Sequence, residues 1–507
     1  MRVSHSFPAI SATFDDPNLV SCAGLAPTLA LAQRAGLGDL VADTLTLKAK
    51  GGVNAHLKVP ALVAGMVAGA DSIDDMDLLR HGGMGRLFNG VRAPSTLGTF
   101  LRSFTFGHVR QLDAVASRFL FGLAKNAPIL PGVGQGCYVD VDDTIKATYG
   151  YAKQGVGYGY TKVKGLNALL AIVSTPVSAP VIVATRLRRG GTNSARGAAK
   201  FVADALATAK ACGAGGLVTV RADSAYYAHD VIAAARRAGA RFSVTVRSNS
   251  AVIKAISQIP ESAWTPIRYP NAIWDEDEQR FISDAEVAEV EFTGFTSRRK
   301  ADHITARLIV RRVKRLNPKS VPQGQGELFS LYRHHGIFTD SPLVMLQAEK
   351  SHRGHAIIEQ VIADTKSGAL AHLPSGSFAA NSAWLVLAAI AFDPRRRNHR
   401  LGLPRQGHHR DHPPATDRRP GPPGHLRQTT GPAPTQRLVM VGQLARALQR
   451  HVRTTNPSND LTTQPQQANR RTQWKAGQTG GCPIPHRRIS ARNRSHSTAN
   501  TSAVDRG

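Results

Sequence analysis

The chain has few cysteines and no apolar run long enough to cross a membrane. Its four cysteines show no CxxC pair and no metal-ligand spacing, which argues against a disulfide scaffold or a zinc module and favours free thiols in a reducing compartment. The longest apolar stretch, residues 383–392, is shorter than the ~20 residues of a membrane span and predicts a buried helix. The first residues lack the apolar segment of a signal peptide. We therefore expect a cytoplasmic protein with no membrane partner.

Acidic residues are also scarce. Against 64 Lys and Arg there are 35 Asp and Glu, so the 507-residue chain has a formal net charge of +29. A charge of this sign and size favours nucleic acid as the partner, because binding releases counterions.

Much of this charge lies in the last part of the chain. Residues 394–507 contain 20 Arg, 1 Lys and 4 Asp, and so carry 17 of the 29 net charges. Few aliphatic residues accompany them, which predicts a disordered, basic, low-complexity tail. The tail is either a DNA-binding segment or the translation of a GC-rich gene in a shifted reading frame. Sequencing the gene distinguishes the two, because a frameshift requires that a single-base shift restores a helical, less basic C-terminus.

The length allows two to four domains. In residues 1–130 apolar residues recur at helical spacing, which predicts a helical N-terminal domain for DNA binding or dimer contacts. Within it, Ser95 and Thr96 begin an amphipathic helix that either enters a DNA groove or packs as an ordinary core helix.

Residues 131–248 change to the pattern of an α/β core. We expect helices at 195–212, which Gly213 terminates, and at 230–238. Residues 249–348 carry short alternating runs broken by Pro and Gly, which predicts a β-rich insertion, and residues 349–393 return to a helical pattern with a last apolar helix at 378–392. The expected core strands are 138–145, 167–173, 181–185, 217–221 and 242–246.

Two expected strands carry carboxylates that would point to one place. In YVDVDDT, residues 138–144, strand alternation places Asp140 and Asp142 on the same face. Asp223 follows the fourth expected strand, at the end where a parallel sheet usually forms its site. A strand buried in an α/β core rarely carries such charges without a function.

A third carboxylate, Glu359, lies on an expected helix that spans 352–366. Its polar neighbours His352, His355 and Lys366 fall within about 60° of one another and of Glu359 on a helical wheel. This stripe either presents a carboxylate flanked by phosphate-binding cations or is an ordinary solvated face.

Two Asp and one Glu suit a site for two magnesium ions, since hard carboxylate oxygens hold hard cations without completing their coordination shells. Such ions, roughly 3.5 to 4 Å apart, activate a water or a 3′-hydroxyl and stabilise the leaving oxygen of a phosphoryl transfer. No Cys and His cluster of the kind that zinc prefers accompanies these residues.

The blocks VDVDDT, VRADSAYY and HRGHAIIEQVIADTKSGALAHLPSGSFAANSAWLVLAAIAF resemble the DDE transposases of bacterial insertion sequences. The likeness is to insertion-sequence family thirteen-eighty, within the group that shares a Y-x2-R-x3-E-x6-K signature, and covers about residues 20–392. It implies an α/β fold with an RNase H-like catalytic core, formed by 131–248 and 349–393 and interrupted by the insertion at 249–348. It also implies two Mg²⁺ per active site, which Mn²⁺ can replace.

The resemblance also assigns site residues. It implies that Asp142, Asp223 and Glu359 are the catalytic and metal-binding carboxylates, with Asp140 as an alternative metal ligand and first carboxylate. Lys366 stands at the last position of the signature.

The chain departs from the signature at two positions. His352 holds the Tyr position and His355 the Arg position, and a histidine is only partly charged near neutral pH. Arg353 is a candidate for the missing cation. We expect these three residues and Lys366 to contact DNA.

Residues 155–164, GVGYGYTKVK, predict a hairpin beside the first strand. The mixture of aromatic and basic residues, with Lys162 and Lys164 among them, suits either a DNA-facing ribbon or a simple exposed turn.

The expected protein is a nucleoid-associated cut-and-paste transposase. It would bind the inverted-repeat ends of double-stranded DNA as a homodimer, cleave them, and join the 3′-hydroxyls to target DNA. Two alternatives remain open: an RNase H-like nuclease that acts on RNA–DNA hybrids, and a catalytically dead DNA-binding relic.

Overall fold

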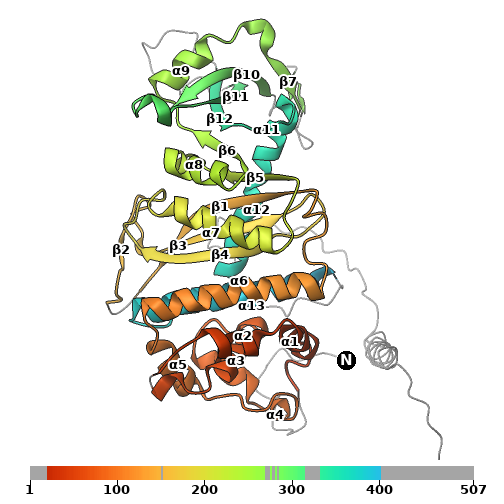
Figure 1. The fold of residues 1–507 in the computed structure, drawn as a ribbon, viewed down its shortest axis with the longest axis vertical. Helices are drawn as coiled ribbons and strands as arrows, with labels where there is room; N and C mark the ends of the chain where they lie inside the picture. The colour runs from red at the N-terminus through yellow and green to blue at the C-terminus, as the bar shows by residue number, and fades with distance from the viewer. Residues whose placement is uncertain are drawn as a thin grey trace, which may run out of the picture. The chain divides into compact units, whose positions relative to one another are not determined.

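One large mixed β-sheet organises the part of the chain that the structure describes (Figure 1). The structure is a computed structural model, and it describes residues 20–48, 50–149, 152–268, 274–276, 280–281, 285–314 and 332–400. The prediction of a disordered tail concerns residues 394–507, nearly all of which lie outside these ranges.

Helices precede the sheet, as the periodicity of residues 1–130 predicts. Helix α6 buries Leu112, Val115 and Phe119 along one face, at the spacing of three to four residues that an amphipathic helix requires. Helix α5 buries Leu97 and Phe100, so its apolar face belongs to the core. The helices are α1 (Leu25–Arg34), α2 (Leu37–Thr44), α3 (Ala55–Ala68), α4 (Met84–Leu87), α5 (Pro94–Arg102) and α6 (Phe106–Asn126).

The first part of the sheet contains the five predicted strands, which are confirmed in number, order and approximate bounds. Strands β1 (Gly136–Ala147), β3 (Lys164–Ser174) and β4 (Val181–Arg189) form an antiparallel meander. Strand β5 (Leu217–Ala222) then pairs parallel with β1, and β6 (Arg241–Val246) pairs parallel with β5. The order across the sheet is β4-β3-β1-β5-β6.

Two predicted helices make the crossovers. Helix α7 (Ala198–Ala211) connects β4 to β5, and α8 (His229–Arg237) connects β5 to β6. Helix α7 buries Phe201, Val202 and Ala205 on the face that was expected to pack. Parallel strands need such crossovers, because a tight turn can join only antiparallel neighbours.

Residues 249–348 are rich in strands, as predicted, but these strands extend the same sheet. Strand β12 pairs antiparallel with β6, and β11, β10 and β7 follow in order. Pairing with β12 satisfies backbone groups of β6 that would otherwise form an open sheet edge. The elements are α9 (Ser250–Ser257), β7 (Thr265–Ile267), β8 (Trp274–Asp275), β9 (Arg280–Phe281), β10 (Ala285–Gly294), β11 (Ile304–Lys314) and β12 (Tyr332–Thr339), of which β8 and β9 form a separate pair.

The last described segment is helical. Helices α11 (Met345–Arg353), α12 (Ile357–Lys366) and α13 (Phe378–Arg400) follow one another, with a 3₁₀ turn at Gly354–Ala356 between the first two. The expectation of one continuous helix from 352 to 366 is therefore wrong. The break lies beside Arg221, since a Cβ on Gly354 would approach Arg221 Nη1 to 2.8 Å.

Helix α13 is the buried apolar helix predicted at 378–392. It packs against β4, α6 and α3, and the Trp384 indole N–H donates to the carbonyl of Ala369 at 2.6 Å. Within the described ranges, none of the helices has the length and apolar character of a membrane span.

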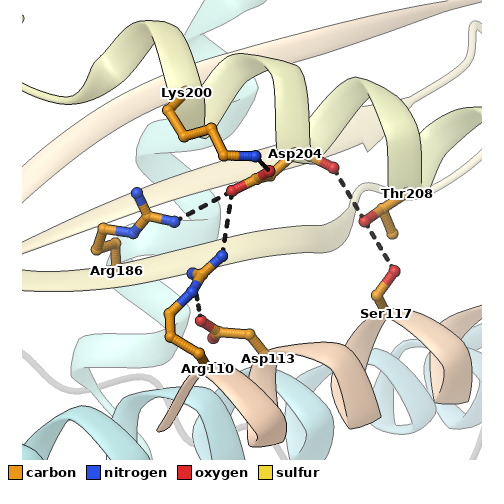
Figure 2. A network of polar contacts seen from close by, with 7 residues as sticks. All are labelled: Arg110, Asp113, Ser117, Arg186, Lys200, Asp204 and Thr208. Atoms are coloured by element: carbon orange, nitrogen blue, oxygen red, sulfur yellow. Dashed lines mark hydrogen bonds and ion pairs between the residues drawn. The ribbon is translucent and has the colours of Figure 1, made fainter. Parts of the chain in front are cut away.

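A polar network joins α6, α7 and β4 (Figure 2). Its centre is Asp204 on α7, whose carboxylate accepts from Lys200 at 2.7 Å, from Arg186 at 3.2 Å and from Arg110 at 3.4 Å. Arg110 lies on α6 and Arg186 on β4, so one carboxylate links the N-terminal helices to the sheet. The other members of the network are Asp113, Ser117 and Thr208.

Candidate active site

Asp142 and Asp223 are neighbours on adjacent parallel strands. In the β1–β5 ladder Val141 is paired with Ala222. Asp142 follows Val141 within β1, and Asp223 follows Ala222 directly after the end of β5. Adjacent strands lie roughly 4.8 Å apart, so the register places the two carboxylates side by side. Both residues are half-buried.

Both carboxylates have raised pKa values. Burial raises the pKa of Asp142 to about 7, and the nearby charge of Asp223 adds to the rise. Burial also raises the pKa of Asp223. Two half-buried carboxylates with raised pKa values form a site that a cation would stabilise.

Asp140 has a different environment from Asp142, although both lie on β1. It is fully buried, and its two oxygens accept hydrogen bonds from Arg221 Nε at 2.6 Å and Nη2 at 2.7 Å. Burial by itself would raise the pKa of Asp140, but the charge of Arg221 and the hydrogen bond with His355 hold it below its ordinary value. Asp140 is thus an ionised carboxylate already occupied by protein donors.

His355 connects this ion pair to the aspartate pair. Its Nδ1 lies 3.0 Å from Asp140 Oδ1, in the 3₁₀ turn between α11 and α12. Its charge lowers the pKa of both Asp142 and Asp223, so the ring is close to both carboxylates. A hydrogen bond at Nδ1 fixes the orientation of an imidazole and leaves Nε2 for a second partner.

Glu359 is exposed in the first turn of α12. Two contacts place α12 along β1: His355 meets Asp140 just before the helix, and Lys366 Nζ lies 3.2 Å from Thr144 Oγ1 at its end. Glu359 lies between these contacts in sequence and on the same helical stripe as Lys366. Across the described ranges, however, no three His, Cys, Asp or Glu side chains are gathered as a metal site would gather them.

His352 and Arg353 are engaged by protein groups. The ring of His352 is buried between the hydroxyls of Ser243 and Thr245, with 2.9 Å from Nδ1 and from Nε2 respectively. Burial lowers its pKa to about 3, so the ring is neutral. Arg353 Nε donates to both oxygens of Glu349, at 2.8 and 2.9 Å. The His352 contacts therefore connect α11 to β6. The Arg353–Glu349 pair lies within α11, one turn apart.

Lys162 and Lys164 lie on the predicted hairpin, which is confirmed. Strand β2 (Gly157–Tyr158) pairs antiparallel with the start of β3, and both lysines are exposed.

Arg221 was not identified from the sequence. The sequence feature that could have identified it is a single charged residue inside the largely apolar strand 217–222, two residues before Asp223. Its guanidinium also lies 4.0 Å from the ring centroid of Tyr138 and donates to the Ser351 carbonyl at 2.5 Å. One side chain thus joins β1, β5 and α11.

The residues around the aspartate pair fit a divalent cation. Carboxylate oxygens are the ligands that Mg²⁺ prefers, and here two of them are adjacent with raised pKa values. The hydroxyl of Tyr226, three residues after Asp223, is buried without a hydrogen-bond partner in the described part of the chain. Burial raises its pKa, and the charges of Asp143, Asp142 and Asp223 raise it further.

An α/β sheet with two adjacent aspartates at the point where the pairing of two parallel strands ends is the kind of site that holds divalent cations. The chain matches the family model of the transposase DDE domain, group 1, over residues 4–406, and therefore belongs to this family of DDE transposases. No curated protein matches it. Among solved structures it is similar to the piggyBac transposase in a synaptic complex with hairpin DNA, determined by cryo-EM, with 12% identity, a TM-score of 0.34 and 77% of each chain covered. The assignment follows from the family model.

Proposed function

We propose that this chain is a cut-and-paste DNA transposase whose catalytic carboxylates are Asp142, Asp223 and Glu359. The observation that carries the proposal is the register of β1 and β5, which sets Asp142 beside Asp223. Family membership supplies the reaction class, and the narrower assignment to insertion-sequence family thirteen-eighty stays a prediction. We propose further that β4-β3-β1-β5-β6 is the RNase H-like core.

Asp142 is a better candidate than Asp140 for the first of the three catalytic carboxylates. Asp140 already accepts three hydrogen bonds from Arg221 and His355, and a metal ion would have to displace them. Asp142 accepts from the backbone N–H of Asp143 at 2.7 Å and keeps lone pairs for a cation. In this account Asp140 and Arg221 hold His355 in place.

Asp142, Asp223 and Glu359 would hold two Mg²⁺ ions, or Mn²⁺ in their place. When bound, these ions would polarise the scissile phosphate and favour the deprotonated form of the attacking water or 3′-hydroxyl. Glu359 would complete the ligand set from α12 through a movement of its exposed side chain.

The DNA would lie over the same face. His355 would donate from Nε2 to a phosphate oxygen beside the carboxylates, and Lys366 would act from the other end of α12. Lys162 and Lys164 would contact the backbone from the hairpin. His352 and Arg353, expected to contact DNA, instead hold α11 in this proposal. The enzyme would act as a homodimer on two inverted-repeat ends.

A gel-shift and cleavage assay on the DNA that flanks the gene tests this function. We expect the wild-type protein to bind that DNA and to nick it in magnesium buffer, and Asp223→Ala and Glu359→Ala to bind without cleaving. Cleavage by either variant contradicts the proposal. Cleavage of RNA–DNA hybrids without a need for the flanking ends indicates the alternative nuclease, and binding without turnover by the wild-type protein indicates a relic.

A further inference from the structure

The β2–β3 hairpin is fixed to the end of β4 by close backbone contacts. The N–H of Gly190 donates to the carbonyl of Gly155 at 3.0 Å. A Cβ on Gly159 would come within 2.7 Å of the Gly190 carbonyl oxygen, and a Cβ on Gly190 within 2.4 Å of the Gly157 oxygen. Only glycine permits this approach, so the hairpin has a defined position on the sheet.

That position is the carboxyl end of β1, beyond the aspartates. In the strand ladders Gly165 pairs with Ala147 on one side and with Gly157 on the other. Gly159 packs beside Ile145, where an added Cβ would meet the Ile145 Cδ1 at 3.8 Å. The turn that follows Tyr158 therefore lies beside the carboxyl-terminal half of β1, the strand that carries Asp142.

Two aromatic rings of this hairpin are left in solvent. Tyr158 is 67% exposed and Tyr160 is 78% exposed. Tyr158 is the last residue of β2, whereas Tyr160 lies in the turn beyond it, next to Gly159 and therefore beside β1. Besides partial burial, the charges of Asp143, Asp142 and Asp223 raise the pKa of the Tyr160 hydroxyl. Lys162, next but one in the chain, adopts a left-handed backbone at φ 56° and lies in the same exposed turn.

We propose that Tyr160 is a base-stacking residue, whose ring receives an unpaired base of a DNA end while the adjoining phosphate lies at the aspartate pair. The proposal rests on the proposed function. An exposed ring next to lysines is what single-stranded DNA requires, since every base offers a π face and the lysines neutralise neighbouring phosphates. Stacking of one base on an aromatic side chain contributes roughly 1–3 kcal/mol.

Fluorescence of 2-aminopurine tests the stacking directly. The probe is an end duplex with a short single-stranded 3′ extension that carries 2-aminopurine, bound by the full-length protein in buffer without divalent metal, so that no cleavage occurs. We expect wild type and Tyr160→Phe to quench the probe equally. Tyr160→Ala should abolish the quenching and weaken binding about 5- to 150-fold.

Tyr158→Ala is the matched control, because it removes another exposed aromatic ring from the same hairpin and should leave both the quenching and the affinity unchanged. Binding of a blunt duplex should not differ between wild type and Tyr160→Ala. Quenching that survives in Tyr160→Ala, or an equal loss in Tyr160→Phe or Tyr158→Ala, overturns the stacking role. Absence of quenching by the wild-type protein overturns it as well.

These outcomes are separate from those of the catalytic proposal. A protein that quenches the probe but never cleaves end DNA in magnesium contradicts the proposed function and leaves the stacking role supported. If the wild-type protein cleaves end DNA but Tyr160→Ala still quenches the probe, only the stacking role is contradicted.

Discussion

Arg221 and Asp140 form a buried, bidentate ion pair between two parallel strands, with distances of 2.6 and 2.7 Å. Only 3% of the Arg221 side chain and none of the Asp140 side chain is exposed. Removal of one partner would leave the other charge buried and uncompensated, so we expect Arg221→Ala to lower the free energy of unfolding by about 3–5 kcal/mol. Chemical denaturation measures this change.

Arg236 offers a control for that variant. It lies 4.0 Å from Asp340, but 53% of its side chain is exposed. Arg236→Ala should cost less than about 1 kcal/mol. Equal losses in the two variants would show that the Arg221 pair has no special role in stability.

The neutral ring of His352 makes stability depend on pH. Its pKa is about 3 in the folded protein, against 6.5 for the free side chain. The unfolded chain therefore binds a proton that the folded chain excludes, and stability is lost as pH falls from about 6.5 towards 3, by roughly 1.4 kcal/mol per pH unit. Above pH 6.5 this contribution is fully present.

His352→Gln keeps hydrogen-bonding groups near Ser243 and Thr245 without the titration. We expect the difference in unfolding free energy between wild type and this variant to decrease steadily in urea titrations from pH 6.5 to pH 5. Two parallel curves would mean that the ring is not buried in its neutral form.

Removal of the Asp204 carboxylate should lower the free energy of unfolding more than removal of any one of the cations that it binds. It accepts from Arg110, Arg186 and Lys200, and its side chain is 27% exposed (Figure 2). Asp204→Asn should reduce the unfolding free energy by about 1–2 kcal/mol. Lys200→Ala, which removes a partner that is 73% exposed, should cost at most about 0.5 kcal/mol. A larger loss for Lys200→Ala contradicts a network centred on Asp204.

The hairpin lysines should determine part of the salt dependence of DNA binding. Removing one lysine that neutralises a phosphate reduces the slope of log K against log salt by about 0.9, so Lys162→Ala with Lys164→Ala should reduce it by about 2. Fluorescence anisotropy between low and moderate salt measures the slope. Lys200→Ala is an exposed control on α7 and should leave it unchanged; an unchanged slope in the double variant excludes both lysines from the DNA interface.

The sequence predicted the strands of the core well, because alternation and apolar runs directly reflect burial on a sheet. It also placed Asp142 and Asp223 on neighbouring strands, which the β1–β5 register confirms. Local patterns could not show that β12 would pair with β6, since that pairing joins residues about 90 positions apart.

The helical wheel of residues 352–366 was correct for one part of the segment and wrong for the other. It correctly grouped Glu359 with Lys366, which share α12. It also included His352, on the assumption of one continuous helix, but the 3₁₀ turn at Gly354–Ala356 turns that ring towards Ser243. The break begins at Gly354, a residue type that disfavours helix, and lies beside Arg221, which is distant in sequence. The helical period of the segment by itself contains no signal of it.

The most direct test of the central claim is the single-turnover rate of end-DNA cleavage in Mg²⁺ for Asp142→Asn and Asp223→Asn, with binding measured in parallel. The account predicts that each variant binds the DNA as tightly as wild type and cleaves it at least about 1,000-fold more slowly. Cleavage by Asp142→Asn within about tenfold of the wild-type rate would contradict the assignment of the adjacent pair as the catalytic carboxylates.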